Sequence, residues 1–259
     1  MQIQFLGSGG AFTDHRINYN NNAIVQTSEG WVLLDCGQTA AQSLLEIDIH
    51  PSELRALVIT HLHCDHASPE PIIWKRYYAS KHGPPGFLST PIYAPADVLD
   101  PLLMSLEPFI GTFGNRHAKV QTNGTTALIE AHRTMSCTIG DTEFSFFPVH
   151  HIHQGEIDKP AYGIRITQGQ KRVYWSGDTT FDSEWICAAA NDPLTQTIFH
   201  ECMFFPVFPG TAHTHWVELL TLPPEVLQKV VLMHHTEVPS GLDISACSGA
   251  ADRHQVFSW

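Results

Sequence analysis

The sequence lacks several features that mark secreted and membrane-bound proteins. Its six cysteines are scattered and form no CxxC pair, so we expect reduced thiols in a cytoplasmic protein rather than a disulfide framework. No basic segment followed by an apolar core opens the chain, and no run of about 18 apolar residues occurs in it. We therefore expect neither a secretory signal nor a membrane span.

Positive charge is also scarce, with 14 Lys and Arg against 26 Asp and Glu and a formal net charge of −12. Proteins that bind long nucleic acids rely on Lys and Arg contacts with phosphates, so this balance disfavours long RNA or DNA as a partner. A small anion held by metal ions remains compatible with it. The 43% of hydrophobic residues disfavours disorder, and 259 residues are enough for one large α/β domain with a substantial core, which we expect to span 1–259.

Histidine, by contrast, is abundant at 17 residues, and its densest cluster lies in residues 60–66. The apolar run 56–59 predicts a buried strand, which places the cluster in the loop at the end of that strand. His61 and His63 are two residues apart, so on an extended chain they point to the same side. Asp65 and His66 follow where the chain must turn and can face a second ion. Imidazole and carboxylate donors together suit Zn, Fe, Ni or Mn.

Residues 61–66, His-Leu-His-Cys-Asp-His, resemble the HxHxDH signature of the metallo-β-lactamase superfamily. Further stretches are similar to its ribonuclease Z-like and cyclic-nucleotide phosphodiesterase-like branch: Leu-Gly-Ser-Gly-Gly at 6–10, Leu-Leu-Asp-Cys-Gly at 33–37, Ser-Gly-Asp-Thr at 176–179 and His-Glu at 200–201. The resemblance implies the α/β fold class, as a four-layer αββα sandwich with a metal site at one edge.

The resemblance also implies a site for two divalent metal ions, Zn in the first instance, with Mn or Fe possible. The implied ligands are His61, His63 and His151 for one ion, Asp65, His66 and His234 for the other, and Asp178 between them. A carboxylate can bind two cations because it has two oxygens, which a neutral imidazole cannot do. His153 stays open as an alternative to His151. Asp35 is expected to support the ligand histidines by hydrogen bonding.

The implied catalytic residues come from three places in the chain. Residues 211–216 lie where ribonuclease Z-like members carry a histidine motif, so His213 is the expected proton donor, with His215 as the open alternative. Glu201 is expected to orient this histidine, as a carboxylate orients the base of a catalytic triad. Asp65 is expected to help orient the attacking water.

Together these residues imply a binuclear metal-dependent hydrolase. The favoured activity is that of a phosphodiesterase that cleaves a small phosphodiester, such as a cyclic nucleotide, by attack of a metal-bridged hydroxide. The acidic composition favours this substrate over precursor tRNA, but a ribonuclease Z-like tRNA 3′-processing endonuclease stays open. A carboxyl ester, thioester or lactone hydrolase and a di-iron oxygen-dependent enzyme on the same fold stay open too.

A homodimer is expected from the superfamily branch. Four segments have further candidate roles, and the first of them, 107–126, is a candidate lid or dimer element. The segments 83–90 and 107–126 are also candidates for a reduced form of the ribonuclease Z arm. The basic, aromatic stretch 74–82 is a candidate for a substrate mouth. The C-terminal residues 257–259, Phe-Ser-Trp, suggest packing on the body of the protein or on a partner subunit.

Overall fold

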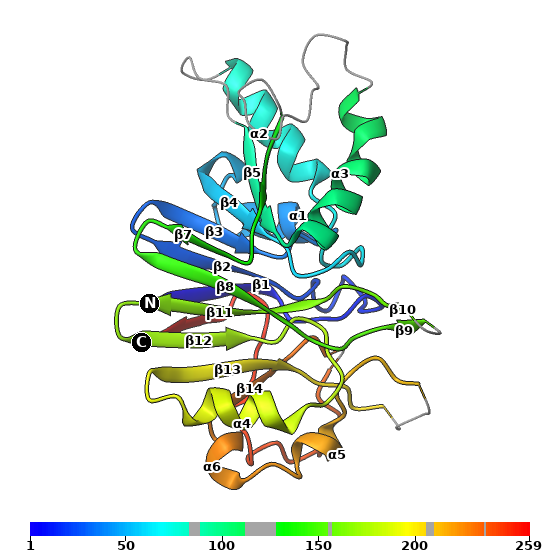
Figure 1. Cartoon of the computed structure of the whole chain (residues 1–259), viewed down its shortest axis with the longest axis vertical. Coiled ribbons are helices and arrows are strands. Elements are labelled where there is room, and N and C mark those ends of the chain that lie inside the picture. Colours follow the sequence, from blue (N-terminus) through cyan, green and yellow to red (C-terminus); the bar gives the residue numbers. More distant parts are fainter. Residues whose placement is uncertain (83–88, 112–127, 155–156, 206–209, 236) are drawn as a thin grey trace.

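Two large β-sheets packed face to face form the centre of the protein, and helices cover the outer face of each (Figure 1). This arrangement comes from a computed structural model that describes residues 1–82, 89–111, 128–154, 157–205, 210–235 and 237–259. The layers are those of the αββα sandwich that the 61–66 motif predicts, so the predicted fold class is confirmed. Within the described residues, no helix is long and apolar enough to span a membrane.

The first sheet is built from the N-terminal half of the chain and its last strand. Its strands are β1 (Gln2–Gly7), β2 (Asn22–Thr27), β3 (Gly30–Leu34), β4 (Leu54–Val58), β5 (Thr90–Ala94), β6 (Ile129–Arg133) and β16 (Val256–Ser258), in the spatial order β16-β1-β2-β3-β4-β5-β6. The strands from β3 to β6 are parallel. Parallel strands need crossover connections, and α1 (Ala40–Glu46), the 3-10 turn η1 (Pro51–Glu53), α2 (Glu70–His82) and α3 (Ala96–Gly111) lie within them.

The second sheet is built from the C-terminal half. Its strands are β7 (Ser136–Ile139), β8 (Thr142–Pro148), β11 (Tyr162–Gln168), β12 (Lys171–Trp175), β13 (Thr195–Glu201), β14 (Val230–Met233) and β15 (Gly249–Ala250), in the spatial order β15-β14-β13-β12-β11-β8-β7. The helices α4 (Ser183–Asn191), α5 (Trp216–Leu219) and α6 (Pro224–Leu227) lie on its outer face (Figure 1). A separate two-stranded ribbon consists of β9 (His153–Gln154) and β10 (Ile157–Asp158).

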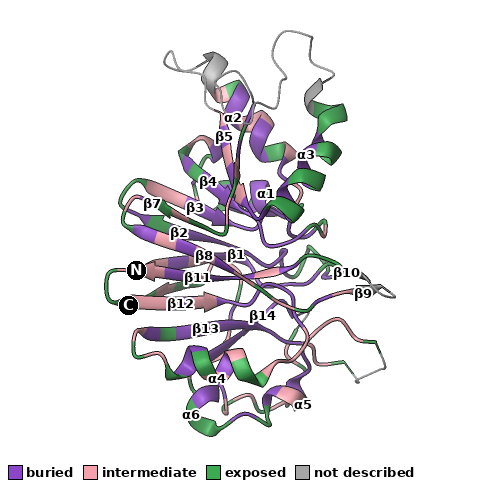
Figure 2. Ribbon diagram, in the orientation of Figure 1, coloured by how far each residue is buried: buried purple, intermediate pink, exposed green. Residues whose placement is uncertain are grey.

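Three apolar clusters fill the spaces between the layers, because successive side chains of a strand point to opposite faces. In β1, Leu6 packs with the helices α1 to α3, while Ile3 and Phe5 pack between the two sheets. The ring of Phe5 lies 5.4 Å from that of Trp175 and 5.1 Å from that of Phe199, across the two sheets. Figure 2 shows the result as buried strands in the middle of the molecule and an exposed outer surface on α3.

Two local features become clear only in the structure. The helix α4 begins at Ser183, because the side chain of Asp182 accepts the Glu184 amide and caps the helix there. The C-terminal residues form the unpredicted strand β16, which pairs with β1. Of the candidate arm and lid segments 83–90 and 107–126, residues 83–88 and 112–126 lie outside the described residues.

The parallel strands carry the candidate site residues to one edge of the sandwich. β3 and β4 end just before Asp35 and the 60–66 loop, and β12 and β14 end just before Asp178 and His234. The backbone turns sharply there, since Asp35, Gly177 and His234 all have left-handed φ angles of 54°, 61° and 55°. Such conformations are costly for residues other than glycine and concentrate at functional sites.

The tail provides a stability test of this architecture. The ring of Phe257 packs 4.9 Å from that of Phe199, whereas its neighbour Val256 points outward and is 46% exposed. We predict that Phe257→Ala lowers the free energy of unfolding by about 1–3 kcal/mol in urea titrations. The control Val256→Ala should change it by no more than about 0.5 kcal/mol. Equal effects of the two substitutions would contradict the packing of β16 on the core.

Candidate metal centre

Asp35 organises the loop that follows β4. Its Oδ1 accepts the Thr60 amide at 2.8 Å and the Thr60 hydroxyl at 2.9 Å. The Thr60 hydroxyl has given its one proton to Asp35, so at 3.1 Å it accepts from His61 Nδ1. Oδ2 of Asp35 accepts from His66 Nδ1 at 2.8 Å. One buried carboxylate thus leaves the Nε2 lone pairs of two histidines free to bind a ligand.

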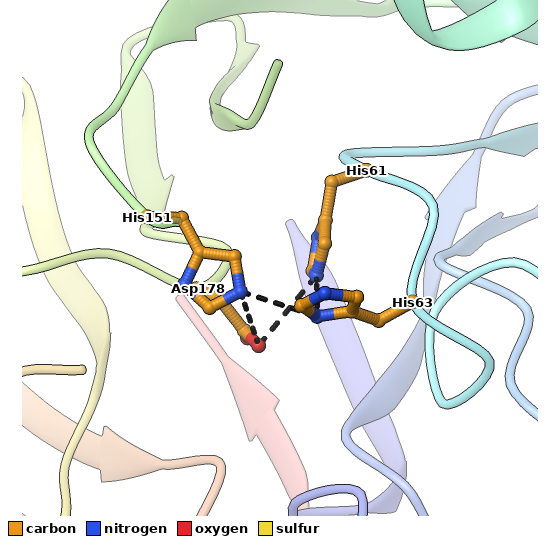
Figure 3. A group of neighbouring side chains, drawn as sticks. All are labelled: His61, His63, His151 and Asp178. Atoms are coloured by element: carbon orange, nitrogen blue, oxygen red, sulfur yellow. Dashed lines mark hydrogen bonds and ion pairs between the residues drawn. The ribbon is translucent and has the colours of Figure 1, made fainter. Parts of the chain in front are cut away.

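The first group of donors contains His61, His63, His151 and Asp178 (Figure 3). Nδ1 of His63 lies 3.1 Å from His61 Nε2 and 3.2 Å from His151 Nε2. The Asp178 Oδ2 atom lies 3.6 Å from His61 Nε2 and 3.7 Å from His151 Nε2. His151 Nδ1 donates to the Ala212 carbonyl at 2.8 Å, which leaves its Nε2 as the atom that faces the group.

The second group contains Asp65, His66, Asp178 and His234, all buried. Nε2 of His66 lies 3.2 Å from Asp178 Oδ1 and 3.3 Å from Asp65 Oδ2. Nε2 of His234 lies 3.2 Å from Asp65 Oδ2 and 3.4 Å from Asp178 Oδ2. Asp178 belongs to both groups and contributes a different oxygen to each close contact with His66 and His234.

Hydrogen bonds among these donors leave several of their lone pairs without a partner, and divalent metal ions would fill these places. Three imidazole nitrogens converge in the first group, and His61 and His151 have both committed their ring protons elsewhere, so their Nε2 lone pairs need a partner. In the second group, Oδ1 of Asp65 and Oδ1 of Asp178 are buried without a hydrogen-bond partner in the described part of the chain. Cations would satisfy these oxygens and nitrogens together.

The electrostatics of the cluster agree with this fit. Burial lowers the pKa of His61, His63 and His151, so these imidazoles are neutral and able to bind a metal ion. Burial opposes ionisation of Asp178 as well, but the nearby histidines outweigh it and hold the pKa of this carboxyl well below its usual range. The pKa of His234 is raised to about 10 against its burial, because Asp178 and Asp65 lie beside it. The buried carboxylates therefore require positive charge.

Another buried carboxylate orients the predicted proton donor. Glu201 Oε2 accepts from His213 Nδ1 at 2.6 Å, and its Oε1 accepts the Thr179 amide. The His213 ring lies 4.9 Å from that of His151 and 5.3 Å from that of His234. Burial alone would lower the pKa of His213, but the Glu201 carboxylate outweighs it and raises this pKa above its ordinary value.

The structure separates several histidines that the sequence left as alternatives. His215 is a buried residue at the start of α5, where its amide donates to Glu218 Oε2 at 2.8 Å, so His213 is the one beside the donor groups. At 150–153, His151 faces the first donor group, whereas His150 is exposed. His153 lies in the ribbon strand β9, and its side chain lies outside the described part of the structure. All seven predicted ligands come together, and their binding of metal stays a prediction.

An open cavity of about 630 Å³ leads to this cluster. One wall carries Asp65, Asp178 and His213, and the other walls carry the apolar side chains of Phe12, Met203, Phe204 and Phe205. Its volume suits a small molecule. The sequence predictions missed the apolar walls, although Phe12 lies two residues after the glycine turn at 7–10 and residues 203–205 begin two residues after the His-Glu strand end.

The fold and the site together define a class, that of metal-dependent hydrolases of the metallo-β-lactamase fold. The chain belongs to the family described as anti-Pycsar protein Apyc1, whose family model matches residues 1–256. One relative, the anti-Pycsar protein Apyc1 of Paenibacillus sp. (strain J14), is 28% identical, and the match covers 100% of this chain and 99% of that protein.

Two solved structures share the fold. The Bacillus subtilis metallo-β-lactamase fold protein YhfI superposes with a TM-score of 0.73 at 18% identity, covering 99% of this chain and 98% of that one. The short form of human tRNase Z superposes with a TM-score of 0.66 at 15% identity, covering 100% of this chain and 99% of that one. A ribonuclease Z of Exiguobacterium sp. (strain ATCC BAA-1283 / AT1b) is 27% identical over 66% of this chain and 50% of its own length. Together with the family match, it confirms the resemblance to the ribonuclease Z-like branch of the superfamily.

The role of Asp35 can be tested by metal binding alone. Asp35→Asn keeps the shape of the side chain but presents an amide where Thr60 and His66 need an acceptor. We predict a loss of metal affinity of about 10–100-fold, measured by competition with a chromogenic chelator. The control is Asp141→Asn, which changes an exposed carboxylate beside Ser28 at the β2–β3 hairpin. Unchanged affinity in Asp35→Asn would remove Asp35 from the support of the site.

Proposed function

We propose that this protein is a metal-dependent phosphodiesterase that hydrolyses a small phosphodiester such as a cyclic nucleotide. The observation that carries the proposal is the position of Asp178 between two groups of donors, with His213 beside them at the wall of a small cavity. Two zinc ions would be held there, one by His61, His63 and His151 and the other by Asp65, His66 and His234, with Asp178 shared by the two donor groups.

Such ions would supply positive charge against the phosphoryl oxygens and lower the pKa of a bound water toward about 7. The chain itself supplies orientation and proton transfer. Asp65 lines the cavity, so its carboxylate can accept a hydrogen bond from the attacking water and align it.

His213 is the proposed proton donor to the leaving oxygen. Its Nδ1 is tied to Glu201, so Nε2 is the atom that can give a proton to a substrate in the cavity. The Glu201 carboxylate favours the charged imidazolium and fixes the plane of the ring. The same Oε2 atom lies 3.4 Å from His234 Nδ1, so Glu201 links the proton donor to a proposed ligand.

The size of the cavity and the net charge of −12 support a small substrate over a long nucleic acid. Three expectations accompany the proposal and stay predictions: one domain over 1–259, a homodimer and a cytoplasmic location. Light scattering on the purified chain would test the homodimer.

The proposed activity is tested first with a general phosphodiester. We predict turnover of bis(p-nitrophenyl) phosphate by the Zn- or Mn-loaded protein, followed by turnover of cyclic nucleotides. His63→Ala removes one of the three converging nitrogens and should abolish turnover by weakening metal binding. A protein that binds both ions and cleaves neither diester would contradict the proposal.

A second test concerns the proton donor. His213→Ala should lower kcat for a cyclic nucleotide by about 10²–10⁴-fold with the metal content unchanged, because only protonation of the leaving oxygen is lost. The matched control is His15→Ala, which removes an exposed imidazole on the loop that carries Phe12. If His213→Ala turned over the cyclic nucleotide as fast as the control, His213 would have no part in the mechanism.

A further inference from the structure

We propose that Phe12 and Phe205 bind the flat aromatic group of the substrate, so that the enzyme selects phosphodiesters that carry a base over diesters of equal charge without one. The inference rests on the proposed phosphodiesterase activity and adds the part of the substrate that the apolar walls recognise. Both side chains line the cavity that contains Asp178 and His213.

The loop between β1 and β2 presents Phe12 to solvent without support from neighbouring side chains. Its ring is 98% exposed, which is unfavourable for an apolar side chain and contributes nothing to the core. The loop around it is nevertheless well anchored. Asn18 accepts the Ser8 amide at 3.3 Å and donates to the Ser8 hydroxyl at 3.0 Å, and Thr13 is buried over Gly9.

The segment after β13 presents Phe205 in a similar way. Met203 is fixed by its amide, which donates to the Thr214 carbonyl at 2.8 Å. The Phe204 ring packs 6.2 Å from that of Trp216 and 6.0 Å from that of His235. The next ring, Phe205, is 52% exposed. Each loop is therefore anchored by buried or half-buried residues and has an exposed phenyl ring beside them.

The ionisable and the apolar side chains around the cavity recognise different parts of the substrate. None of the described residues that line it is Lys or Arg, so no described side chain there offers a permanent cation to a phosphate. The phosphodiester group must then be recognised at the donor cluster. The remaining part of the substrate meets phenyl rings and the Met203 thioether, which favour a flat, polarisable group. A nucleoside cyclic monophosphate matches both features of the cavity, because its single phosphate can lie at the donor cluster and its base can lie against the apolar walls.

The test compares a nucleoside 3′,5′-cyclic monophosphate with the methyl riboside 3′,5′-cyclic phosphate, which has the same ring and charge but lacks the base. Stacking on one ring corresponds to about a 5- to 150-fold effect. Phe12→Ala should raise KM for the nucleotide by that factor, leave kcat within about twofold, and leave KM for the riboside unchanged. Phe12→Trp should restore the nucleotide KM, and Phe205→Ala should behave like Phe12→Ala.

The control is Ile17→Ala, which removes an exposed apolar side chain from the same loop without touching the cavity wall. Equal kcat/KM of the wild type for nucleotide and riboside would overturn the inference and leave the phosphodiesterase standing. So would a Phe12→Ala variant that affects both substrates alike, or one that changes the oligomeric state and not KM. A wild type that cleaves neither substrate would overturn the proposed function, and this inference with it.

Discussion

The buried carboxylate of Asp178 sets the main constraint on this structure. It is 1% exposed, and its oxygens lie between 3.2 and 3.7 Å from ring nitrogens of His61, His66, His151 and His234. A carboxylate so deeply buried needs positive charge nearby, which divalent metal ions would supply. The histidines come from loops of both sheets, so the interaction also holds the two halves of the sandwich in register at this edge.

Two other buried carboxylates, Asp35 and Glu201, fix the orientation of histidines at the site. Asp35 fixes two histidines of the 60–66 loop, one directly and one through Thr60, and Glu201 does the same for His213. Each of these acids follows or ends a strand, so the rigid sheets hold the site histidines through one or two hydrogen bonds. The left-handed backbone at Asp35 and His234 also positions the site, because it turns the chain abruptly toward the cluster at the end of each strand.

Local patterns explain how much was predictable. The 61–66 motif and the strand-end position of Asp178 lie in short continuous stretches, so the fold and the association of seven donors followed from the sequence. The remaining features depend on tertiary contacts, which local sequence patterns do not show. The sequence alone does not show that His215 starts α5 and that His213 is therefore the one beside the donor groups. The strand β16 is too short to show an alternating pattern. The cavity walls combine Phe12 with residues from 203 onward, which no local pattern connects.

We propose that this buried cluster binds divalent metal ions. The most direct measurement is the zinc content of the purified, zinc-reconstituted protein by elemental analysis, beside Asp178→Asn prepared in the same way. We predict one zinc per chain for each of the two donor groups in the wild type, and loss of at least one in the variant. A folded wild-type protein without bound zinc, manganese or iron would contradict it.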